Sequence, residues 1–131
     1  MKYVYNDGGR AKYFKGDARD CVVRAIAIAT GKDYKEVYNE VAKIIGYTPR
    51  NSIKKKDTKK VMNILGFKWV SCMGIGTGCT THLKEDELPN GTIVCQVTGH
   101  LTTVIDKVIN DTFNPSRDGT RCVYGYWYIE E

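Results

Sequence analysis

Two residues in this chain have the types and positions expected of a thiol-based catalytic pair. Cys21 begins an apolar run that continues to Thr30, and His100 begins a run of strand-forming residues that continues to Ile105. A thiolate is the reactive form of cysteine, and both a helix N-terminus and a nearby imidazolium lower a cysteine pKa. The pattern therefore predicts Cys21 as a nucleophile on a helix and His100 as its general base on a strand.

A third side chain is expected to hold the imidazole in one tautomer. The strand that His100 begins and the next strand form a predicted hairpin around residues 106–107. A two-residue turn places His100 opposite Phe113, with Asp111 one diagonal step away on the same face. A three-residue turn instead places Asn114 opposite His100. The turn lacks Asn-Gly and Asp-Gly, so both registers stay open, with Asp111 preferred and Asn114 as the alternative.

Acyl transfer also needs donors that stabilise an oxyanion. The backbone N–H of Cys21 lies in the first helical turn, where it has no intrahelical acceptor, and we expect it to serve as one donor. For a side-chain contribution the candidates left open are Gln96, which is the only glutamine, and Asp17. Asp20 precedes the helix, and we expect its carboxylate to cap the helix N–H groups, which draws its charge away from the sulfur.

The elements that must position these residues follow from hydrophobic periodicity. The Cys21–Thr30 segment is apolar almost all round, which is typical of a buried central helix, and Gly31 ends it. An amphipathic helix follows from Asp33 to Gly46, and a short one starts near Asp57 and runs to Gly66. Strands are predicted over Phe67–Cys72, Thr92–Val97, His100–Ile105, Val108–Phe113 and Cys122–Ile129, after an irregular arm at Tyr3–Tyr13. Helices before an antiparallel sheet indicate an α+β fold.

Three segments together resemble the papain-like cysteine peptidase superfamily: Asp20-Cys21-Val22-Val23-Arg24-Ala25, then Gly99-His100, then Asp111-Thr112-Phe113. The resemblance covers most of the chain, and it is greatest to small bacteriophage and prophage proteins of this type and to the double-glycine-leader peptidase branch. It implies one papain-like domain over residues 1–131, with the Cys on a central helix packed on a C-terminal antiparallel sheet. It also implies a hydrolase that cleaves a peptide or isopeptide bond of a peptide or protein substrate.

The same resemblance leaves an alternative open. The superfamily usually has a Gln shortly before the Cys, whereas this chain has Lys15, Asp17 and Arg19 there. The alternative is therefore a papain-fold binding protein with weak or no catalysis, phage-encoded and directed at a host component.

Composition limits the setting of such a protein. The 131 residues are 42% hydrophobic and carry a net charge of +5, and no apolar run is long enough to cross a membrane. The first residues lack the apolar region of a secretory signal, so we expect a cytoplasmic protein, in a bacterial host if phage-encoded. The lysine-rich segment 54–60 is interpreted as a solvated helix start rather than a nucleic-acid site, because aromatic residues do not interleave with it. The oligomeric state stays open.

The five cysteines are expected to be reduced, because an odd count without a secretory signal argues against a disulfide framework. Cys72, Cys79 and His82 are candidate zinc ligands, with Cys95 or Cys122 as a fourth. Their spacing is wider than that of usual zinc knuckles, so no metal or cofactor is expected. Arg24, inside the apolar helix, is expected to pair with a buried acid.

Overall fold

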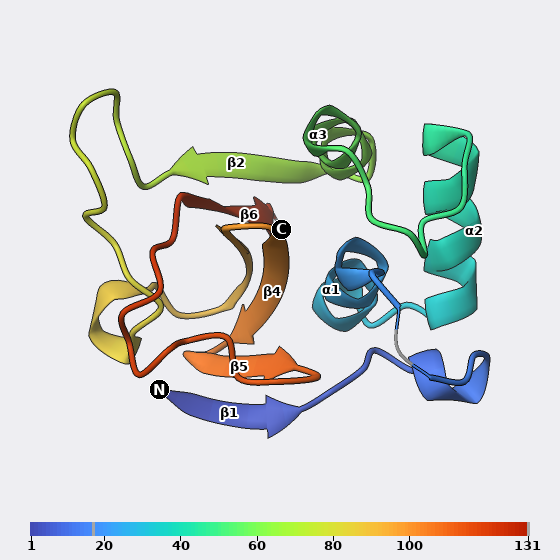
Figure 1. The fold of residues 1–131 in the computed structure, drawn as a ribbon, viewed down its shortest axis with the longest axis horizontal. Helices are drawn as coiled ribbons and strands as arrows, with labels where there is room; N and C mark the ends of the chain where they lie inside the picture. Colours follow the sequence, from blue (N-terminus) through green and yellow to red (C-terminus); the bar gives the residue numbers. More distant parts are fainter. Residues whose placement is uncertain (17, 131) are drawn as a thin grey trace.

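The structure is a computed structural model that describes residues 1–16 and 18–130, and it has the α+β class that the sequence predicts (Figure 1). Its helices are α1 (Cys21–Thr30), α2 (Tyr34–Ile45) and α3 (Lys55–Ile64), with short 3-10 helices η1 (Arg10–Lys12) and η2 (Glu85–Glu87). Its strands are β1 (Lys2–Tyr5), β2 (Phe67–Ser71), β3 (Thr92–Val97), β4 (His100–Ile105), β5 (Val108–Asp111) and β6 (Gly125–Ile129).

The strands form one sheet in the order β1-β5-β4-β3-β6-β2. Every neighbouring pair is antiparallel except β1 and β5, which are parallel. The prediction of a purely antiparallel sheet and of an irregular N-terminal arm is therefore wrong at this edge. Asn6 and Tyr3 explain the pairing, since the Asn6 N–H (2.9 Å) and the Tyr3 hydroxyl (3.1 Å) both donate to the backbone oxygen of Asp111.

One face of the sheet packs against the helices, with α1 between the sheet and α2 (Figure 1). The apolar character of α1 is explained by this position, because Val23 and Ile26 are fully buried. The hydroxyl of Thr103 on β4 donates to the backbone oxygen of Ala25 at 2.8 Å and fixes the helix on the sheet. Gly31 ends α1 in the left-handed conformation (φ 71°), as predicted from its position.

The other face of the sheet encloses a second core. Its members come from β3, β4 and β5, from the segment around η2 and from the segment before β6: Leu83, Leu88, Ile93, Cys95, Val97, Val104, Ile109 and Val123. Figure 1 shows the sheet curled on this side. Leu101 and Val104 lie in different cores, so β4 is buried on both faces and is held firmly along its length.

The cysteines do not all stay reduced. Cys79 and Cys122 form a disulfide, whereas Cys21, Cys72 and Cys95 are free. The backbone brings the pair together: the Val123 N–H donates to the Thr81 oxygen at 2.8 Å, beside the bridge that joins His82 to Cys122. The expectation of reduced thiols is corrected here, because a sequence separation of 43 residues gives no signal of this approach.

No helix in the described residues is both long enough and apolar enough to cross a membrane.

Candidate active site

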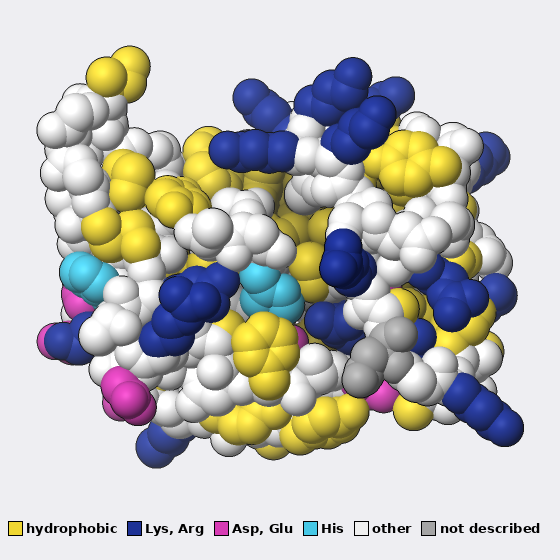
Figure 2. Space-filling view, in the orientation of Figure 1, with side chains coloured by type: hydrophobic (Ala, Val, Ile, Leu, Met, Phe, Trp, Pro, Cys, Tyr) yellow, Lys and Arg dark blue, Asp and Glu magenta, His cyan; other side chains and the backbone are white. Residues whose placement is uncertain are grey.

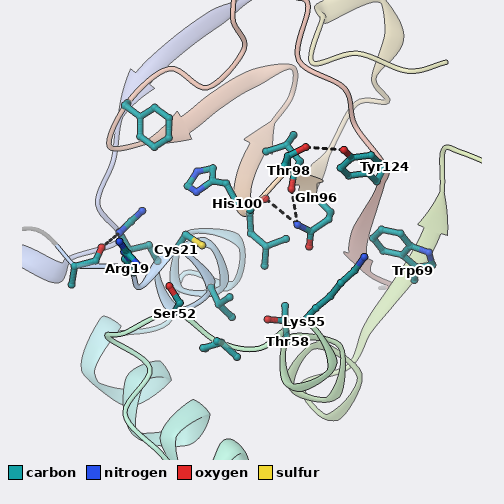
Figure 3. A pocket seen from close by; sticks show the side chains of 18 residues that line it. Arg19, Cys21, Ser52, Lys55, Thr58, Trp69, Gln96, Thr98, His100 and Tyr124 are labelled. Atoms are coloured by element: carbon teal, nitrogen blue, oxygen red, sulfur yellow. Dashed lines mark hydrogen bonds between the residues drawn. The ribbon is translucent and has the colours of Figure 1, made fainter. Parts of the chain in front are cut away.

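The structure brings together the N-terminus of α1, the start of β4 and the end of β5. Cys21 is the first residue of α1, His100 is the first of β4, and Asp111 is the last of β5. The Nε2 atom of His100 lies 2.7 Å from Oδ2 of Asp111. Cys21 and His100 line the same cleft and are seen together in Figure 3.

The β4–β5 hairpin sets the contact between His100 and Asp111. It has the register of a two-residue turn, with Ile105 opposite Val108, and both turn residues have positive φ (47° at Asp106 and 68° at Lys107). When this register is continued beyond β5, His100 is opposite Phe113, and their ring centroids are 5.0 Å apart. Asn114, the alternative third residue, instead accepts a hydrogen bond from the Ser116 N–H at 3.1 Å.

Electrostatics favour a charged imidazole beside a charged sulfur. Burial by itself lowers the pKa of His100, but Asp111 and Cys21 outweigh it and raise that pKa to about 9. Burial by itself raises the pKa of the Cys21 thiol. The His100 ring outweighs that effect, helped by the Leu101 backbone and the charge of Arg24, so the thiol pKa falls below its ordinary value.

Asp111 is held in its charged form. Burial alone raises the pKa of its carboxyl group, but His100 and further hydrogen bonds lower it below the usual value. One of these comes from the Thr112 N–H, which donates to Oδ1 at 2.7 Å. Since β1 also holds the backbone oxygen of Asp111, both the main chain and the carboxylate of this residue are fixed.

Asp20 occupies the N-cap position of α1, but its side chain makes no capping hydrogen bond. Its carboxylate is buried and forms ion pairs with Arg10 (3.0 Å) and Arg24, and it accepts a hydrogen bond from the Tyr34 hydroxyl. The predicted cap is therefore wrong, because two buried guanidinium groups are stronger partners for a carboxylate than backbone N–H groups. The prediction that Arg24 pairs with a buried acid is confirmed.

The site opens into a cleft of about 710 Å³ (Figure 3). Residues from α1, α3, β2, the β3–β4 hairpin and nearby loops line it: Ala18, Arg19, Cys21, Val22, Arg24, Ser52, Ile53, Lys55, Thr58, Trp69, Gln96, Val97, Thr98, Gly99, His100, Leu101, Phe113 and Tyr124. Cys21 is partly buried and lines this cleft.

Gln96 is in this cleft, whereas Asp17, the other candidate side chain for the oxyanion, lies outside the described residues. The amide nitrogen of Gln96 donates to the backbone oxygens of Val97 (2.8 Å) and His100 (3.2 Å), which ties the β3–β4 hairpin together. The Gln96 side chain thus supports the backbone that carries His100. The first-turn N–H groups of α1, including that of Cys21, remain the donors that an oxyanion can meet.

The candidate zinc ligands Cys72, Cys79 and His82 do not form a metal site in the described residues. No group of three or more candidate ligands is found within residues 1–16 and 18–130. Cys79 is bonded to Cys122, and the His82 ring lies 3.7 Å from the Cys79 sulfur on one side and 3.2 Å from Glu87 on the other. The lysine-rich segment forms the start of α3, and its Lys55 lines the cleft.

Several cleft residues carry no signal in the sequence. Trp69 and Tyr124 come from β2 and from the loop before β6, far from Cys21 along the chain, and only the sheet order brings them near it. Trp69 lies against Gly125, where an added Cβ would be 2.3 Å from Cζ2 of the indole. In the β2–β6 register Trp69 is opposite Trp127 and reaches Gly125 diagonally, a contact that neither residue indicates in the sequence.

Comparison with known proteins gives no relative: no family model, no curated protein and no solved structure matches the chain.

Proposed function

We propose that this protein is a thiol hydrolase of the papain-like kind that cleaves a peptide or isopeptide bond in a peptide or protein substrate. The observation that carries the proposal is the His100 ring, held by Asp111 at 2.7 Å and placed beside a thiol whose pKa it lowers. A buried structural cysteine would lack such a partner. Cys95 is the contrast within this chain, since burial raises its pKa and no imidazole offsets it.

The first half of the reaction forms an acyl-enzyme. The Cys21 thiolate attacks the carbonyl carbon, and the C=O electron pair moves to oxygen, next to the N-terminal N–H groups of α1. As the tetrahedral intermediate collapses, the C–N bond breaks. His100 gives its proton to the leaving nitrogen, so the amine departs neutral and a thioester remains on Cys21.

The second half restores the enzyme. His100, now neutral, takes a proton from a water molecule as that water attacks the thioester carbon. The C–S bond breaks, the acid product leaves, and the thiolate–imidazolium pair forms again. Asp111 holds the ring orientation in both halves and stabilises the imidazolium.

A peptide-library digest tests the proposal. The protein and its Cys21→Ala variant are incubated separately with a mixture of peptides from a digested bacterial proteome, and new termini are counted by mass spectrometry. We expect new termini with the wild-type protein and none with Cys21→Ala. Equal, background-level termini in both samples, with both proteins folded, would favour the papain-fold binding protein instead.

A further inference from the structure

The cleft around Cys21 is positively charged. Its lining includes Arg19, Arg24 and Lys55 and, in the part of the chain that the structure describes, no Asp or Glu. Figure 2 shows Lys and Arg side chains gathered over α3 and around the hollow in the middle of this face, where few acidic side chains appear. A cleft lined by one sign of charge concentrates ligands of the opposite sign.

Arg24 belongs to a buried cluster beneath the cleft, which has a net positive charge of its own. Asp20 is shared between Arg10 and Arg24, so one carboxylate faces two guanidinium groups. Tyr34, the other partner of Asp20, stays neutral, because burial and the Asp20 charge raise the pKa of its hydroxyl far above neutral pH. The cluster thus keeps one net positive charge next to the N-terminus of α1.

The two exposed cations are available to a ligand. Neither Arg19 nor Lys55 forms an ion pair within residues 1–16 and 18–130. Backbone hydrogen bonds fix the position of Arg19, whose N–H donates to the Arg50 oxygen at 2.9 Å and whose oxygen accepts from Ser52 at 3.0 Å. In Figure 3, Arg19 and Lys55 lie on opposite sides of Cys21, and Lys55 extends from α3 toward Trp69.

We propose that the cleft selects acidic polypeptides, with carboxylate side chains on either side of the scissile bond contacting Arg19 and Lys55. This inference rests on the proposed hydrolase function, which requires an amide carbonyl at Cys21. Three aromatic side chains also line the cleft and stay exposed, Trp69 (41%), Phe113 (47%) and Tyr124 (36%), so their rings can pack against a bound substrate. We take a peptide as the occupant because the proposed hydrolase reaction needs an amide carbonyl at Cys21, and competition by an oligonucleotide is one of the outcomes tested below.

Charged thiol reagents of similar size measure the potential at Cys21. The rate of Cys21 modification is followed by peptide mapping with an anionic, a neutral and a cationic methanethiosulfonate. Relative to the neutral reagent, we expect the anionic one to react about 3- to 10-fold faster and the cationic one slower, an advantage that salt reduces. Lys55→Gln and Arg19→Gln should each reduce the ratio of the anionic rate to the neutral rate. Lys60→Gln, an equal charge change on α3 outside the cleft, should leave that ratio unchanged.

A matched pair of affinity labels then tests the substrate class. Two acetylated tripeptidyl chloromethyl ketones differ only in Asp against Asn next to the reactive group. We expect the Asp label to modify Cys21 several-fold faster, with Lys55→Gln and Arg19→Gln reducing the preference. Equal rates for the two labels, or protection of Cys21 by a single-stranded oligonucleotide but not by polyglutamate, would overturn the inference.

These outcomes separate the two proposals. Slow reaction of Cys21 with the neutral reagent, no faster than that of a free thiol, would count against the hydrolase function. Fast reaction with the neutral reagent and no anionic preference would leave the hydrolase standing and reject the acidic substrate.

Discussion

At the scale of single residues, His100 is placed between a buried carboxylate and a thiol. Asp111 contacts one ring nitrogen, and the pKa of His100 rises to about 9 despite burial. The pKa of Cys21 moves in the opposite direction. The two shifts together favour the state in which sulfur and ring are both charged, which is the state that attacks a carbonyl.

Asp111→Asn should weaken this pair. Without the carboxylate charge the His100 pKa falls, the thiolate loses its stabilising partner, and the Cys21 pKa rises. We expect alkylation of Cys21 by iodoacetamide at pH 7 to slow by about 10-fold, which corresponds to a shift of one pKa unit. The matched control is Asn114→Ala, which should leave the rate unchanged. The opposite result, with Asn114→Ala slow and Asp111→Asn normal, would reverse the assignment.

The sequence was sufficient to predict the pair Cys21 and His100, because each begins an element with clear periodicity. It could not decide between Asp111 and Asn114. The deciding feature is the turn, where Asp106 and Lys107 both take positive φ without the glycine that normally signals it. Tertiary packing of β5 between β1 and β4 compensates for that local cost.

At the scale of elements, α1 is fixed by charge as well as by apolar burial. Asp20 joins η1, α1 and α2 through Arg10, Arg24 and Tyr34. A local pattern predicted a cap at Asp20, but two of its three partners lie ten or more positions away in sequence. A helix-start motif does not show that groups distant in sequence compete with the helix N–H groups for this carboxylate.

The Asp20→Asn variant distinguishes a helix-capping role of Asp20 from a role as the buried partner of two guanidinium groups. Asparagine is as good a helix cap as aspartate, so a capping role predicts a small loss. Because the carboxylate instead compensates two buried guanidinium groups, we expect the free energy of unfolding in urea to fall by about 3–5 kcal/mol. Asp33→Asn, at the N-cap of α2, is the matched control: that carboxylate is exposed and binds the Tyr13 hydroxyl, so its loss should cost under about 1 kcal/mol. Equal losses would contradict the buried ion-pair role.

The β2–β6 pair forms the wall of the cleft at Trp69. In Gly125→Ala the new methyl group would lie 2.3 Å from the indole and 2.6 Å from the Val70 oxygen. The indole can rotate away but the backbone oxygen cannot, so we expect a loss of about 1–3 kcal/mol in urea unfolding and a shift in tryptophan emission. Gly74→Ala, in an exposed loop, serves as control. A Gly125→Ala variant of wild-type stability would show that this contact is absent.

At the scale of the whole molecule, the disulfide Cys79–Cys122 joins the long β2–β3 connection to the segment before β6. Cross-linking positions 43 residues apart restricts the unfolded chain. We expect reduction to lower the free energy of unfolding by about 2–4 kcal/mol. A Cys79→Ser/Cys122→Ser double variant should show no such dependence on reductant. A wild-type protein whose stability is the same with and without reductant would contradict the cross-link.

The global arrangement was only partly predictable. The class, the three helices and the strands β2 to β6 followed from periodicity, with β2, β5 and β6 shorter than predicted. The edge strand β1 did not, because four residues that pair in parallel with β5 carry no pattern of their own. The disulfide and the cleft wall at Trp69 depend on the same long-range assembly.

The central claim is that His100 activates Cys21, and the pH dependence of Cys21 alkylation tests it most directly. Iodoacetamide modification is followed by peptide mapping from pH 5 to 10 in the wild-type protein and in His100→Ala. We predict that the wild-type thiol reacts at a pH below that of an ordinary thiol, and that His100→Ala moves the profile to higher pH. Identical profiles in the two proteins, both with the pKa of a free thiol, would contradict the claim.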